Sequence, residues 1–215
     1  MPYNNIIVLL IFCIILFLII KNFSNVLKFL TDITDTRKKV YYKLHDSNLD
    51  PNFTKITRGI IKNSKWAKLY NLVDAVNSAT SPTSPTSPTP LVNIYLKSEL
   101  EMKPYHDNKQ YHSDGSQIKF SITYKKDGAD PVILINYGNW KNGVKQSKLS
   151  VMDYRTYVIN HELGHALGMD HLTCEESTAI NGVCPVMYQS TRGCNKFKCG
   201  INPSVNDYNA PKLNW

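Results

Sequence analysis

Three histidines in the second half of the chain constrain its fold more than any other feature. His161 and His165 are four residues apart, so a helix through them would place both imidazoles on one face. A straight helix would carry His171 past that point, but Gly168 can adopt the left-handed conformation that ends a helix and turns the chain back. We therefore expect a helix over residues 151–167, a turn at Gly168 and three converging rings.

Three imidazoles with this spacing are a ligand set for a catalytic zinc ion. Imidazole nitrogens bind zinc at about 2.0–2.1 Å, and three protein ligands leave the fourth tetrahedral position open for water or substrate. Glu162 follows the first ligand directly and can take a proton from a metal-bound water without being a ligand itself. The pattern predicts one zinc ion on His161, His165 and His171, with Glu162 as the catalytic base.

Residues 161–171 resemble the H-E-x-x-H-x-x-G-x-x-H helix of the metzincin clan of zinc endopeptidases, in which a Met-turn follows downstream. Residues 184–188, Cys-Pro-Val-Met-Tyr, fit that turn, and the resemblance implies that Met187 lies beneath the three rings as an apolar floor. Ordinary core or surface histidines are the competing interpretation, which the glycine, the third histidine and the Met-turn together disfavour.

The resemblance also offers a weak candidate for an oxyanion stabiliser. Several metzincin families place a tyrosine two residues after the methionine. Here the candidate is Tyr188, which follows Met187 directly, and Gln189 takes the later place.

Residues 132–144 and 153–168 are similar to a little-characterised, mainly bacterial branch of secreted or membrane-anchored metzincin-like proteins.

The rest of the domain has the patterns of a mixed sheet packed against helices. Ser150, followed three places later by Asp153, is a typical start for the metal-binding helix. Strands are expected over residues 40–44, 91–96, 118–124 and 131–136, and a helix over residues 53–61. The expected class is α+β, and the resemblance implies a metzincin-like zincin domain with a twisted mixed sheet, the active-site helix and the Met-turn in its C-terminal part. It also implies that residues 118–124 form the edge strand that pairs with substrate.

An apolar run occupies the N-terminus. No charged side chain occurs between Pro2 and Ile20, and nineteen uncharged residues in a helix nearly span the ~30 Å hydrocarbon core. We therefore predict an N-terminal transmembrane helix over residues 1–21, through which the protein contacts the membrane, and a basic juxtamembrane segment over residues 22–39. A cleaved signal peptide is the alternative, but a basic start and a small-residue cleavage site are both lacking.

Four cysteines cluster near the Met-turn, namely Cys174, Cys184, Cys194 and Cys199. An even, dense set is typical of compartments where disulfides persist, and four cysteines allow three pairings. The resemblance favours a disulfide between Cys174 and either Cys194 or Cys199. Cys184 would then pair with the remaining one of those two cysteines. A second zinc site at Cys194 and Cys199 is the alternative, but no matching Cys-x-x-Cys pair exists.

The membrane orientation depends on two opposing signals. Basic residues follow the apolar run and none precedes it, which favours a domain in the cytoplasm. The cysteines instead favour a domain outside the cytoplasm. We give the cysteines more weight and expect a single-pass membrane protein with its catalytic domain outside the cytoplasm, or on a virion or host membrane if the source is viral.

Residues 40–215 are enough for one domain of ordinary size. Residues 80–90, TSPTSPTSPTP, are a low-complexity repeat that we interpret as an insertion into that domain, the alternative being a linker between two domains. The formal net charge of +8 comes from scattered lysines, which indicates a solvated basic surface, so no nucleic-acid partner is expected.

The predicted function is that of a membrane-anchored zinc endopeptidase acting on a protein or peptide substrate. Zinc would polarise the scissile carbonyl and lower the pKa of its water, and Glu162 would accept the proton and deliver it to the leaving amine. The alternatives are an inactive metzincin-like surface or binding module and a disulfide-stapled structural protein, each with a structural zinc. The intact Glu162 argues against an inactive module.

Overall fold

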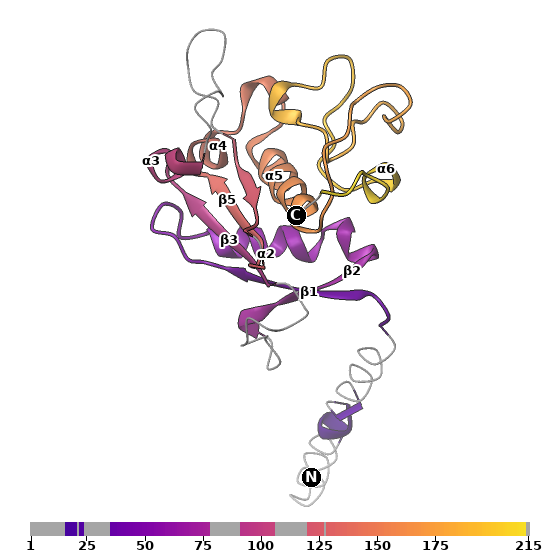
Figure 1. Cartoon of the computed structure of the whole chain (residues 1–215). Coiled ribbons are helices and arrows are strands. Elements are labelled where there is room, and N and C mark those ends of the chain that lie inside the picture. The colour runs from indigo at the N-terminus through magenta and orange to yellow at the C-terminus, as the bar shows by residue number, and fades with distance from the viewer. Residues whose placement is uncertain are drawn as a thin grey trace, which may run out of the picture. The chain divides into compact units, whose positions relative to one another are not determined.

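The computed structural model describes residues 16–20, 22–23, 35–77, 91–105, 120–126 and 128–213 (Figure 1). The chain divides into two units, Met1–Lys38 and Lys39–Trp215. Every residue of the candidate site lies in the second unit.

A five-stranded mixed sheet is the framework of this second unit, in the order β2-β1-β3-β5-β4. Its strands are β1 (Lys38–Leu44), β2 (Tyr70–Asp74), β3 (Leu91–Lys97), β4 (Ile122–Tyr124) and β5 (Val132–Asn136). Strands β1, β3 and β5 run parallel, and β4 pairs antiparallel with β5 at one edge of the sheet. The last four residues of β5 are all buried, as expected for a strand covered on both faces.

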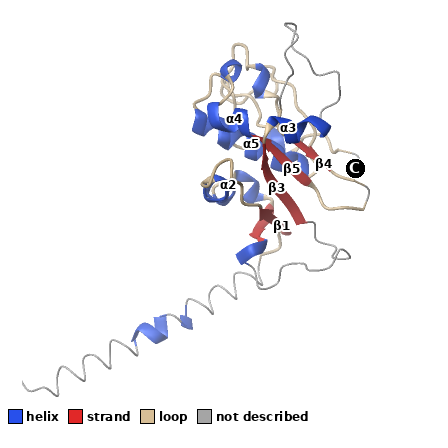
Figure 2. Cartoon of the chain, turned by 90° about the vertical axis from the view of Figure 1, so that its left-hand side faces the viewer, coloured by secondary structure: helices blue, strands red, loops and turns tan. Residues whose placement is uncertain are grey.

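Three helices, α2 (Phe53–Lys62), α4 (Tyr137–Asn142) and α5 (Val151–Ala166), lie on the same side of the sheet (Figure 2). Helix α5 packs against α2, α4, β4 and β5, so it is the central helix of the unit. Eleven of its sixteen residues are buried, which explains why it lacks the usual apolar and polar faces of a surface helix. Its start at Ser150 is as predicted, because the Ser150 side chain accepts a hydrogen bond from the backbone N–H of Asp153.

The remaining elements are short. Helices α3 and α6 span Glu99–Met102 and Val205–Tyr208, and single 3₁₀ turns occupy Lys65–Lys68, Ala75–Asn77, Lys103–Tyr105, Lys145–Ser147 and Ser190–Arg192. After α5 the chain runs mainly as loops, drawn orange to yellow in Figure 1.

The α+β class with a mixed sheet was predicted correctly from the sequence. The strands expected over residues 40–44, 91–96 and 131–136 are β1, β3 and β5, and the helix expected over residues 53–61 is α2. The strand expected over residues 118–124 is shorter, because only Ile122–Tyr124 pair with β5, and residues 118–119 lie outside the described part of the chain. The repeat at residues 80–90 also lies outside it.

The predicted N-terminal transmembrane helix over residues 1–21 requires correction. Among the described residues, no helix combines the length and the apolar character that crossing a membrane requires. Of this segment the structure describes residues 16–20, which are helical.

Candidate metal centre

The end of α5 turns the chain back toward the helix, as the glycine predicted. Gly168 has φ of +88°, and its N–H bonds to the carbonyl of His165 at 2.7 Å. The N–H of Met169 bonds to the carbonyl of Gly164 at 2.9 Å, which completes the pair of hydrogen bonds of a Schellman motif. The reversal brings His171 over the last turn of α5.

The three histidine rings converge on one point. Nε2 of His165 lies 3.2 Å from Nε2 of His161 and 3.2 Å from Nε2 of His171. Two nitrogens bound to one tetrahedral zinc ion at about 2.0–2.1 Å are separated by about 3.3–3.4 Å. The spacing of the rings therefore matches the spacing of ligands around a single ion.

The protonation of the rings favours a cation between the Nε2 atoms rather than hydrogen bonds from one ring to another. Nδ1 of His161 lies 2.8 Å from the carbonyl of Val186, and Nδ1 of His165 lies 2.8 Å from the carbonyl of Met169. A carbonyl oxygen only accepts, so each Nδ1 must carry the proton and, in a neutral ring, each Nε2 presents a lone pair. Two lone pairs facing each other at 3.2 Å repel unless a positive ion lies between them, so this donor set fits a metal.

The surroundings keep these rings neutral. Burial lowers the pKa of His161 well below its usual value and, with the neighbouring His171, lowers the pKa of His165 to about 4. Burial also lowers the pKa of the more exposed His171, assisted by Arg192 and opposed by Asp170. Neutral imidazoles at pH 7 are the form that binds a metal. Among the described residues, these three histidines form a group able to hold one ion.

Glu162 is buried beside the first ligand and held by one side chain from the sheet. The hydroxyl of Thr123, in β4, lies 2.7 Å from Oε2 of Glu162 and 3.0 Å from its backbone carbonyl. Burial raises the pKa of Glu162 to about 7, and the hydrogen bond from Thr123 opposes that shift. A carboxyl group with a pKa near neutrality is suited to accept and return a proton.

A cleft of about 300 Å³ opens over the histidines and Glu162. Its lining comes from residues 120–123, from α5 and from the segments that follow α5. The lining side chains include Phe120, Ser121, Ile122, Thr123, Tyr154, Tyr157, Val158, His161, Glu162, His165, Asp170, His171, Gln189, Thr191 and Leu213. The structure thus brings all four predicted catalytic and metal-binding residues to one cleft. Tyr188 is not among its lining residues, and the backbone carbonyl of Tyr188 accepts from the hydroxyl of Tyr157 instead.

Met187 is fully buried against the segment of α5 between the first two ligands. A side chain on Gly164 would collide with Sδ of Met187, so the Met187 side chain packs against the helix backbone in space that only glycine leaves free. The buried carboxylate of Asp207 accepts a hydrogen bond from the backbone N–H of Met187 at 2.8 Å and others from the N–H and hydroxyl of Ser204. Residues 184–188, the predicted Met-turn, are therefore held by a side chain from α6, which no pattern in the sequence indicated.

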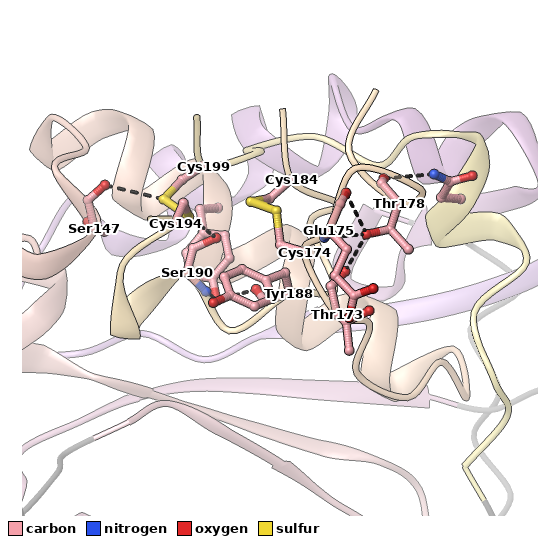
Figure 3. Close-up of a disulfide and its surroundings, with 12 residues drawn as sticks. Ser147, Thr173, Cys174, Glu175, Thr178, Cys184, Tyr188, Ser190, Cys194 and Cys199 are labelled. Carbon is pink, nitrogen blue, oxygen red and sulfur yellow. Dashed lines mark hydrogen bonds between the residues drawn. A yellow bond between two sulfur atoms is a disulfide. The ribbon is translucent and has the colours of Figure 1, made fainter. Parts of the chain in front are cut away.

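Two disulfides fasten the loops around this turn (Figure 3). Cys174 pairs with Cys184, and Cys194 pairs with Cys199. All four cysteines are thus bridged as expected, but the expected pairing of Cys174 with Cys194 or Cys199 is wrong. The first bridge joins the segment after His171 to the start of the Met-turn.

Local turns explain the observed pairing. Asn181 and Gly182 both have positive φ and connect Ile180 to Val183 as a tight hairpin, so the chain returns to Cys174 within ten residues. A second turn, closed by a hydrogen bond from the N–H of Phe197 to the carbonyl of Cys194, brings Cys199 back to Cys194. The Asn-Gly pair is a hairpin signal present in the sequence, and it favours a local partner for Cys184.

Comparisons with known proteins place the chain in a family. A family profile described as "Protein of unknown function (DUF3152)" matches residues 89–208. No curated protein matches the sequence. The solved structure described as "GM1 bound form of the ECX AB5 holotoxin" is 15% identical, with a TM-score of 0.43 over 80% of this chain and 77% of that chain. Because the profile spans more than half of the residues, the chain belongs to the DUF3152 family.

Proposed function

We propose that the chain is a zinc-dependent peptide hydrolase of the metzincin type. The observation that carries the proposal is the convergence of three imidazoles, with Nε2 of His165 3.2 Å from those of His161 and His171, in a cleft that a buried carboxylate also lines. The hydrogen bonds at Nδ1 of His161 and His165 orient both rings toward the shared point. Zinc is the favoured ion because three imidazoles with one open position are a recurrent catalytic set for it.

The ion, when bound, supplies a Lewis acid that polarises a carbonyl and lowers the pKa of water. The chain's own residues do the rest. Glu162 takes a proton from a water molecule in the cleft and later delivers it to the departing amine. His161, His165 and His171 hold the ion and stay neutral because of their burial.

An extended peptide is the substrate class that this cleft fits best. Among the described strands β4 lies at an edge of the sheet, and its residues Ile122 and Thr123 line the cleft, so its outer edge can pair with an extended chain laid across the site. The alternative of a purely structural zinc is disfavoured. A structural site is closed by four protein ligands, whereas three side chains converge here among the described residues, and the point between them faces a cleft.

Two disulfides near the site support an oxidising compartment as the place where the protein works. This proposal concerns the domain of residues 39–215 alone.

The direct test is to incubate the zinc-loaded full chain with a complex peptide mixture and to identify new termini by mass spectrometry. We expect cleavage that stops on treatment with a chelator and returns when zinc is added back. A chain that retains zinc and cleaves no peptide would contradict the proposal and favour a binding module.

A further inference from the structure

We propose that Thr123 is a positioning residue that holds the carboxyl group of Glu162 in one orientation within the cleft. The inference rests on the proposed hydrolytic function and adds a residue to it. Thr123 lies 39 residues before Glu162 in the sequence, on a different element, and no motif singles it out.

The first step is the anchoring of Thr123 itself. It lies in the middle of β4, opposite Ile133 of β5, so backbone pairing fixes its place in the sheet. Strand β4 packs directly on α5, which carries Glu162. A β-branched side chain has few rotamers in a strand, so the hydroxyl points at the helix with little freedom.

The second step is the pair of contacts made by one hydroxyl group. Oγ1 of Thr123 lies 2.7 Å from Oε2 of Glu162 and 3.0 Å from the backbone carbonyl of the same residue. A hydroxyl has one hydrogen to donate and two lone pairs with which to accept. While Glu162 is ionised, the hydroxyl donates to Oε2, and this bond to a charged acceptor is the shorter of the two.

The third step concerns the carboxyl group that receives this bond. The hydrogen bond from Thr123 holds Oε2 against β4, so the side chain of Glu162 keeps one orientation. Its other carboxyl oxygen is left for the reacting water.

The test compares Thr123→Val with Thr123→Ser in the full chain loaded with zinc. Valine keeps the shape but removes the hydroxyl, whereas serine keeps the hydroxyl. We expect kcat for peptide hydrolysis to fall about tenfold or more in Thr123→Val, as for a lost hydrogen bond to a charged group, with KM within about threefold of the parent. Thr123→Ser should restore most of kcat, and both variants should retain zinc.

Thr156→Val is the matched control, because it removes a hydroxyl that bonds within α5 to the carbonyl of Met152. It should leave kcat unchanged. In a Glu162→Gln background, Thr123→Val should not lower kcat further, because Thr123 acts through Glu162. A loss of stability and zinc shared by all Thr123 variants would instead indicate a structural role and contradict the inference.

A crystal structure of each variant gives a readout independent of activity. Glu162 should keep its side-chain orientation in Thr123→Ser and leave it in Thr123→Val. An active parent with equally active Thr123→Val, or an unmoved Glu162 in that variant, would overturn the role of Thr123 alone. A parent that cleaves no peptide would contradict the proposed function, and the role of Thr123 with it.

Discussion

Glu162→Gln should abolish most peptide hydrolysis while the chain keeps its metal. Glutamine has nearly the same shape but accepts no proton at neutral pH, so kcat should fall by about 10²- to 10⁴-fold, as for a lost general base. Glu162 is not one of the three converging ligands, so zinc should remain near one ion per chain. The measurement is kcat on a single peptide together with the metal content of the same sample.

Glu162→Ala tests the same point without any side-chain polar group. It should show a similar loss, and it also empties part of a buried site, so its stability should be measured alongside. Glu176→Gln is the control, because this exposed carboxylate pairs with Lys196 at the surface. A Glu162 variant that cleaves peptides as fast as the parent would contradict the proposed mechanism even with zinc in place.

Gly164→Ala should be strongly destabilising, although alanine is the better helix former. The new methyl group would collide with Sδ of Met187 and lie 2.9 Å from Cζ2 of Trp66, and both side chains are fully buried. Overpacking of a core usually costs about 1–3 kcal/mol of unfolding free energy, and here the strain falls on α5 between the ligands His161 and His165. Chemical denaturation should therefore show a lower midpoint and metal titration a weaker affinity.

Gly59→Ala provides an internal control of opposite sign. Gly59 lies in α2, its backbone φ is not positive, and a Cβ there would meet no atom within 4 Å. The same substitution should raise the unfolding free energy by up to about 1 kcal/mol through helix propensity. Equal effects of the two substitutions would show that Met187 and Trp66 do not restrict Gly164.

The parts of the site that could be predicted are those encoded by local spacing. The separation of His161, His165 and His171, with Gly168 between the last two, specifies a helix and its reversal without reference to the rest of the chain. Strand β5 was equally clear, because a buried parallel strand is a continuous apolar run. Strand β2 was missed because every one of its residues is half-buried, which leaves no alternation to detect.

The parts that escaped prediction depend on contacts between distant segments. Thr123 and Asp207 are unremarkable in the sequence, and only the packing of β4 and α6 against α5 and the Met-turn gives them their roles. The disulfide pairing failed for a different reason. It relied on resemblance and left out the tight turn at Asn181 and Gly182, which reverses the chain between Cys174 and Cys184.

The metal content of the zinc-loaded, dialysed full chain and of its His171→Ala variant, determined by elemental analysis, is the most direct test of the three-histidine centre. His171 is the most exposed ligand, so its replacement should leave the fold intact and remove only one donor. His45→Ala is the control, because that ring stacks on Tyr95 and is not part of the metal-binding group. We expect one zinc ion per chain in the parent and in His45→Ala, and far less in His171→Ala. A parent without zinc, or a His171→Ala variant that retains as much as the parent, would contradict the metal centre on which the proposed function depends.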